Sequence, residues 1–137
     1  MHLSYVLLIP ASMLLCGVLG SAQGADDPPG SIKLLTGYTH QRLRGIDTQV
    51  GKISRKDGLT IQYDIGELAG NYAAQRKSDA AWFKEQVIDG RTVQVALSKD
   101  RQLTVTFTKG PANFVATLKS DEDLAEVLLM LCTYSPK

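Results

Sequence analysis

The chain has 137 residues, of which 44% are hydrophobic and 21% charged, and its formal net charge is +1. This length suits one globular domain, and the balanced charge excludes the strong basic field that recruits nucleic acid. Two cysteines are too few for a scaffold held together by disulfides. We therefore expect a single domain with an ordinary hydrophobic core and no nucleic-acid partner.

The first residues predict export. Residues 3–19 carry no charge, and a run of small residues follows at 20–25. This arrangement is typical of a secretory signal peptide that is cleaved after Ala22 or Gly24. The expected destination is the periplasm or the medium.

Two other fates of this segment compete with cleavage. Retention as a membrane anchor would need a spanning helix, yet the apolar run is short and interrupted by Pro10. Lipidation at Cys16 would give a membrane-anchored lipoprotein, although the large Leu15 stands where that processing requires a small residue. In every case the membrane is contacted only through this segment or its lipid.

The expected organisation has three parts. They are a cleavable signal peptide over 1–22, a flexible leader over 23–32, and a single β-rich domain over 33–137. Cleavage removes one histidine and one cysteine, so the remaining domain keeps only His40 and Cys132.

The first predicted hairpin covers 49–65. A two-residue loop would mix apolar and polar residues on each face, whereas a three-residue loop that ends at a left-handed Gly58 keeps them apart. The expected cross-strand pairs are Ile53 with Ile61 and Gly51 with Tyr63. In the second pair an aromatic ring would lie over a glycine.

A loop and a meander follow. Residues 66–80 lack periodicity, and we expect a loop with a short helical turn near 72–76. Alternating apolar residues then predict four strands, at 81–87, 91–98, 103–108 and 114–118. The first two are expected to turn at 88–90, as in the first hairpin.

A helix is predicted over 121–134. Ser120 is a good N-cap, three acidic residues favour the first turn, and Pro136 ends the helix. Its apolar stripe is expected to consist of Leu124, Val127, Leu128 and Leu131. The predicted fold is therefore α+β, an antiparallel meander of five to six strands with one C-terminal helix packed on one face.

The sequence indicates no catalytic, metal or cofactor site. One histidine and one cysteine cannot form a structural zinc site, and no phosphate-binding or dinucleotide-binding loop is present. The enzymatic alternative is a small hydrolase or lyase that uses Glu85, Asp64 or His40. Glu85 is expected on the same face as Val93 and to pair with Arg91 across the hairpin.

Two surfaces are candidates for binding. If extended, residues 38–44 place Tyr38, His40, Arg42 and Arg44 on one side, and the N-terminal half is rich in basic residues. An anionic envelope ligand or a protein partner would suit this stripe, and a solvated edge strand is the simpler interpretation.

The second surface is the spare face of the C-terminal helix, with Leu129, Met130 and Cys132. It would meet another protein or a second copy of the chain. Cys132 is interpreted as a small buried hydrophobic residue, and an intermolecular disulfide is the alternative.

The leading hypothesis is an exported, non-enzymatic binding or interaction protein of the envelope or medium. The other two hypotheses are the small hydrolase or lyase and a self-associating structural protein of the envelope. A concave pocket that gathers Glu85, Asp64 and His40 would favour the enzyme.

Overall fold

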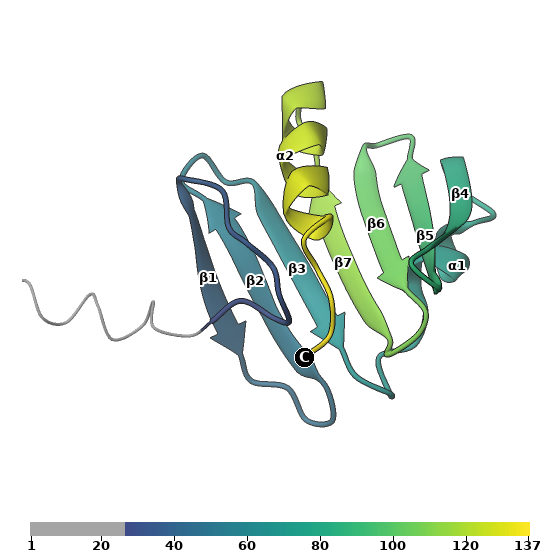
Figure 1. Ribbon diagram of the computed structural model, residues 1–137. Helices are drawn as coiled ribbons and strands as arrows, with labels where there is room; N and C mark the ends of the chain where they lie inside the picture. The colour runs from purple at the N-terminus through teal and green to yellow at the C-terminus, as the bar shows by residue number, and fades with distance from the viewer. Residues whose placement is uncertain (1–26) are drawn as a thin grey trace, which may run out of the picture.

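The computed structural model describes residues 27–137 (Figure 1). The strands are β1 (Tyr38–Leu43), β2 (Gln49–Arg55), β3 (Thr60–Ile65), β4 (Ala80–Ile88), β5 (Arg91–Ser98), β6 (Gln102–Phe107) and β7 (Ala112–Thr117), and the helices are α1 (Tyr72–Arg76) and α2 (Asp121–Leu131). The predicted signal peptide, its cleavage after Ala22 or Gly24, and the alternative lipidation at Cys16 all lie outside the described residues. No helix within 27–137 is long and apolar enough to cross a membrane.

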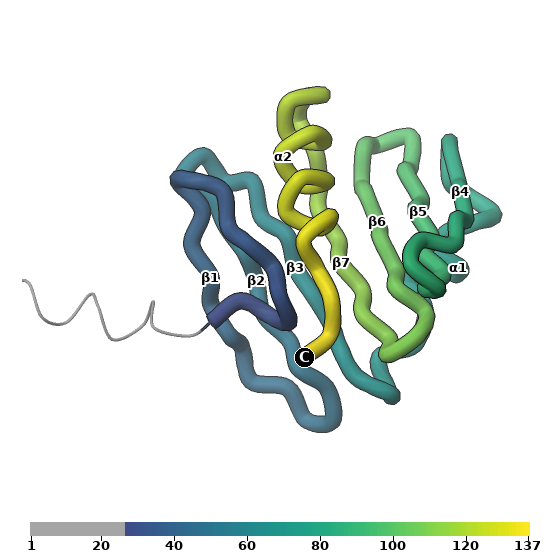
Figure 2. Tube along the Cα trace, viewed as in Figure 1, coloured from purple at the N-terminus to yellow at the C-terminus, as the bar shows by residue number. Residues whose placement is uncertain are grey.

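All seven strands form one antiparallel sheet in the order β1-β2-β3-β7-β6-β5-β4. The predicted α+β class is confirmed, and the sheet exceeds the expected five to six strands because β1 pairs with β2. After β3 the chain crosses to the far edge, and β4 to β7 return so that β7 pairs with β3 (Figure 2). The helix α2 covers one face of the sheet, and α1 lies on the other (Figure 1). We call these the helix face and the groove face.

The β2–β3 hairpin has the predicted register. Ile53 pairs with Ile61 and Gly51 pairs with Tyr63. Gly58 closes the loop with a φ of +97°, in the left-handed region that glycine adopts without strain. A Cβ on Gly51 would lie 2.2 Å from the Tyr63 hydroxyl oxygen, so only glycine fits beneath this ring.

The β4–β5 hairpin differs from the prediction. Ile88 pairs with Arg91, so the loop has two residues, Asp89 and Gly90, both with positive φ. A two-residue loop of this kind matches the twist of the two strands. It shifts the register by one residue, and Glu85 consequently faces Gln94 rather than Val93.

The core lies between α2 and the helix face of the sheet. Its fully buried apolar side chains include Phe114, Ile53, Ile61, Met130 and Val127. Ser120 caps α2 as predicted, since its hydroxyl accepts a hydrogen bond from the Asp123 backbone N–H at 3.2 Å.

The predicted extent and stripe of α2 need correction. The helix ends at Leu131 rather than at residue 134. Val127 and Leu131 of the predicted stripe are buried, but Leu128 is 38% exposed, and Met130 takes the buried place. The helix is therefore rotated relative to the predicted apolar stripe.

The part of the predicted leader that the structure describes is packed on the C-terminal tail. The Ser31 backbone N–H donates to the Ser135 carbonyl at 3.1 Å, and the Lys33 N–H donates to Thr133 Oγ1 at 2.8 Å. Pro29 and Ile32 are buried. The two ends of the described chain thus stabilise each other on the helix face (Figure 1).

Candidate functional site

The three residues of the enzymatic hypothesis do not converge. His40 is buried on the helix face, where its Nε2 lies 2.7 Å from the Tyr63 hydroxyl. Asp64 lies on the groove face of β3, and Glu85 is exposed on β4 and accepts a hydrogen bond from Gln94 at 2.5 Å. Because β1 and β4 are opposite edges of the sheet, six strand spacings, or roughly 29 Å, separate them.

The expected pairing of Glu85 with Arg91 is wrong. The two-residue turn places Arg91 on the helix face and Glu85 on the groove face. Glu85 instead ends a chain of polar contacts in which Gln94 Oε1 accepts from Asn71 Nδ2 at 2.7 Å. Asn71 caps α1, so Glu85 helps to hold this helix in place.

Half of the predicted binding stripe on residues 38–44 is buried and half is exposed. Tyr38, His40 and Arg42 do share one side of β1, but Tyr38 and His40 are buried on the helix face. Arg42 and Arg44 are exposed, and Arg44 lies beyond the end of the strand. Only these two arginines remain as surface cations of the stripe.

Arg55 also contributes less free positive charge than the sequence indicates. Its guanidinium forms ion pairs with Asp57 at 2.5 Å, with Asp123 at 2.8 Å and with Glu126. The Tyr38 hydroxyl donates to the same Glu126 carboxylate. This cluster joins β1 and β2 to α2, and we interpret it as a structural clamp.

The predicted interface on α2 is only partly exposed. Leu129 is 59% exposed and Cys132 is exposed, but Met130 is completely buried. The interpretation of Cys132 as a buried hydrophobic residue is therefore wrong, because it caps α2 at its solvent-exposed end.

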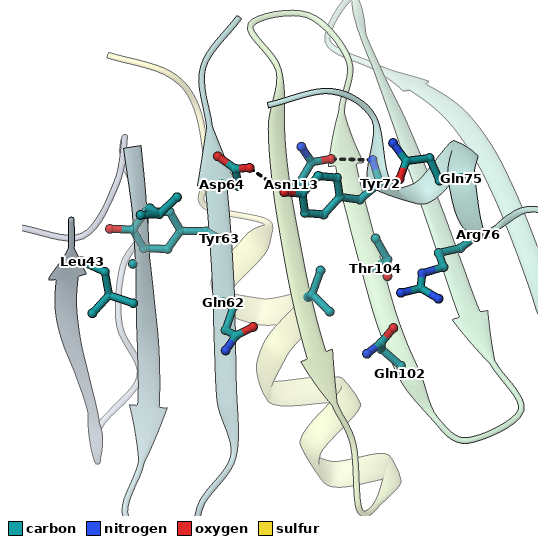
Figure 3. Close-up of a pocket in the computed structure, with 13 residues that line it drawn as sticks. Leu43, Gln62, Tyr63, Asp64, Tyr72, Gln75, Arg76, Gln102, Thr104 and Asn113 are labelled. Atoms are coloured by element: carbon teal, nitrogen blue, oxygen red, sulfur yellow. Dashed lines mark hydrogen bonds between the residues drawn. The ribbon is translucent and has the colours of Figure 1, made fainter. Parts of the chain in front are cut away.

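An open groove of about 550 Å³ lies on the groove face of the sheet (Figure 3). We call it the polar groove. Its polar lining comes from β3, α1, β6 and β7 and consists of Gln62, Asp64, Tyr72, Gln75, Arg76, Gln102, Thr104 and Asn113. Its volume lies within the usual range for small-molecule sites, about 300–1,000 Å³.

Buried polar side chains of the sheet hold α1 over this groove. Asn113 Oδ1 accepts from the Tyr72 backbone N–H at 3.0 Å (Figure 3). It also accepts from the Thr106 hydroxyl at 2.7 Å. Thr106 Oγ1 accepts from the Ala73 N–H at 3.0 Å, and Asn113 Nδ2 donates to the Gly70 carbonyl at 3.1 Å. The first backbone N–H groups of a helix have no partner within the helix, and these contacts supply partners for those of α1. They thereby hold this five-residue helix in place on the sheet.

Asp64 is the charged centre of the polar groove. Its Oδ2 accepts a hydrogen bond from the Tyr72 hydroxyl at 2.5 Å (Figure 3). This hydrogen bond, together with burial, raises the pKa of Tyr72, so its hydroxyl stays protonated and donating at neutral pH. The other oxygen, Oδ1, is shielded from solvent and has no hydrogen-bond partner.

An unpartnered buried carboxylate oxygen is uncommon and costly, because it has lost its water without gaining a donor. Around it, Gln62 and Gln75 are exposed and Gln102 is partly exposed, each with an amide that both donates and accepts. Arg76 balances the charge of Asp64, so the groove as a whole is close to neutral. The arrangement suits a ligand that presents several hydrogen-bonding groups.

Asp64 was a predicted candidate, but the residues around it were not. Asn71, which caps α1, lies in a stretch that was predicted as a loop, and the polar strand residues that line the groove were predicted to face solvent. No group of three metal-binding side chains gathers anywhere in the described 27–137 region.

Comparisons of the chain with protein families, with curated proteins and with solved structures found no match.

Proposed function

We propose that the protein is an exported, non-enzymatic binding protein that holds a small, neutral, hydroxyl-rich ligand such as a saccharide in the polar groove. The observation that carries the proposal is the shielded Oδ1 of Asp64, an acceptor without a donor on a residue that lines the polar groove. A ligand hydroxyl would supply that donor.

The chemistry of the lining supports a neutral ligand. One carboxylate and one guanidinium, Asp64 and Arg76, leave no net charge to attract a strong anion or cation. Amide side chains at Gln62, Gln75 and Gln102 can each pair with a hydroxyl as donor or acceptor. Apolar side chains at Leu43, Val50 and Val115 would contact the carbon skeleton.

The separation of the candidate catalytic groups favours binding over hydrolysis or elimination. In general acid–base chemistry each participating group must lie within hydrogen-bond reach of the reacting centre. Asp64 has Tyr72 beside it, but His40 lies on the opposite face and Glu85 on a distant strand.

Isothermal titration calorimetry with a panel of neutral mono- and disaccharides tests the proposal, with acetate and spermidine as charged comparison ligands. We expect saturable binding of at least one saccharide and an affinity at least about tenfold lower in Asp64→Ala, because a charge-assisted hydrogen bond contributes about 1.5–3 kcal/mol. Glu67→Gln is the matched control, since Glu67 is exposed just after β3 and does not line the groove. Equal affinities in wild type and Asp64→Ala would contradict the proposal.

A further inference from the structure

A second cavity lies on the helix face, between α2 and the β4–β5 hairpin. It has a volume of about 290 Å³ and a mostly apolar lining. Val93, Val95 and Val105 form its floor, and Leu128 and Leu131 form its helical wall. We call it the apolar groove. It is distinct from the polar groove because the two cavities open on opposite faces of the sheet.

Arg91 provides the only cationic side chain in this lining. Its guanidinium lies 4.6 Å from the ring centre of Phe107 and 5.3 Å from that of Tyr134. Nη1 donates to the Tyr134 carbonyl at 3.2 Å. No carboxylate of the described residues forms an ion pair with it, so its positive charge is uncompensated there.

The other two nitrogens of this guanidinium, Nε and Nη2, are shielded from solvent and have no hydrogen-bond partner. Donors on one edge of a guanidinium form the fork that binds the two oxygens of a carboxylate. A buried charged donor without an acceptor is strongly disfavoured, and two on one side chain point to a missing acceptor. We propose that the apolar groove binds a single-chain alkyl carboxylate of the fatty-acid class, with its headgroup on this fork of Arg91.

The backbone around the groove favours an alkyl chain over a peptide. The strand β5 is paired with β4 and β6, and β6 is paired with β5 and β7, so their main-chain groups are already used. The remaining wall is a helix, whose backbone bonds are internal. A peptide in this groove would bury amides without partners, whereas an alkyl chain has none to satisfy.

The rim of the groove also fits an amphipathic ligand. Ile88 and Leu128 are 54% and 38% exposed at its edge, and a bound chain would cover both. Asp89 also lines the groove and is exposed at the turn, where solvent screens its charge from the headgroup. Reaching the shielded nitrogens requires side-chain movement, which is common when proteins bind ligands.

Calorimetric titration of the purified full chain with decanoate tests this proposal. We expect saturable binding, at least about tenfold weaker binding of 1-decanol, and no binding of an apolar tetrapeptide with a free carboxylate. Arg91→Met keeps a long side chain against the two rings but removes the fork, and we expect its affinity for decanoate to fall at least about tenfold. Arg101→Gln is the matched control, because it removes the same charge outside the groove and should bind decanoate like the wild type.

A second measurement does not depend on any variant. In the unmodified protein, decanoate should shift the nitrogen-15 NMR signal of the Arg91 Nε–H, whereas 1-decanol should leave it in place. Equal binding of decanoate and 1-decanol, an unshifted Nε–H at saturation, or preferential binding of the tetrapeptide would each overturn the proposal. Asp64→Ala should bind decanoate with the affinity of the wild type, because Asp64 does not line the apolar groove. Decanoate binding can therefore be tested independently of saccharide binding.

Discussion

Arg55 joins the sheet to α2 through ion pairs with Asp123 and Glu126. Its side chain is 23% exposed, and it neutralises Asp123, whose side chain is only 5% exposed. Removing one member of such a pair leaves the other charge buried and unpaired, which costs far more than the pair contributes. Tyr38 adds to the cluster from β1, because its ring lies 5.8 Å from the guanidinium carbon.

Arg55→Met is therefore expected to lower the free energy of unfolding by about 3 kcal/mol. Urea denaturation followed by circular dichroism measures this change. The matched control is Arg101→Gln, which breaks an ion pair with the 94% exposed Asp121 and should cost no more than about 1 kcal/mol. Equal losses in the two variants would show that the clamp contributes no more than a surface ion pair.

Asp123 makes the stability of the protein sensitive to acid. The Lys119 backbone N–H and the Arg55 guanidinium hold the pKa of Asp123 below its ordinary value of 3.8. Because the pKa is lower in the folded state, the carboxylate stabilises the fold above its unfolded pKa, and this contribution is lost as the pH falls through the folded pKa.

We expect the free energy of unfolding to decrease as the pH is lowered from about 5 toward 3. Asp123→Asn should be less stable at neutral pH and show a shallower acid dependence. Urea titrations at several pH values compare the two proteins. Parallel pH profiles for wild type and variant would contradict this role of Asp123.

Among the secondary-structure elements, the short helix α1 depends on the sheet for its stability. A helix of five residues is not stable alone, and this one depends on the sheet beneath it. Asn113 and Thr106, both completely buried, hold the first N–H groups of α1. The polar groove therefore depends on polar contacts that the hydrophobic pattern does not reveal.

Asn113→Ala removes three hydrogen bonds and should cost about 2–3 kcal/mol, because it leaves buried groups without partners. Amide hydrogen exchange should show protected Tyr72 and Ala73 N–H groups in the wild type and fast exchange in the variant. Thr117→Ala, an exposed change on the same strand and face, is the control. Unchanged protection in Asn113→Ala would mean that another contact positions α1.

The alternation of apolar residues was sufficient to predict β2 to β7 and the β2–β3 register, but not β1. It failed at the β4–β5 turn because Asp-Gly occurs in both hairpins but closes a three-residue loop in one and a two-residue loop in the other. That single difference moved Glu85 to the groove face and separated it from Arg91. The polar groove could not be predicted because Asp64, Tyr72 and Asn113 meet only through the pairing of β3 with β7.

In the whole molecule, the polar groove and the apolar groove lie on opposite faces of the sheet. Both contain a shielded charged atom without a partner, Oδ1 of Asp64 in one and the fork of Arg91 in the other. Elsewhere in the described chain the buried charges are largely paired, as at Arg55. The Arg101 Nε is also shielded and without a partner, but it lines neither cavity.

Export is part of the same proposal. The packed region begins before Ser31 and Ile32, downstream of both predicted cleavage points, so cleavage would leave these contacts intact. Sequencing the N-terminus of the protein recovered from cells should give a start at Gln23 or Ala25. A start at Met1 or a lipid-modified Cys16 would contradict the cleaved form.

We propose above that the polar groove binds a hydroxyl-rich ligand through Asp64. Nitrogen-15 NMR of the side-chain amides of Gln62, Gln75 and Gln102 during titration with the saccharide panel tests it most directly. We expect saturable shifts of these three amide signals with at least one saccharide, and their loss in Asp64→Ala. If no saccharide moves them, or if they move equally in Asp64→Ala, the claim is contradicted.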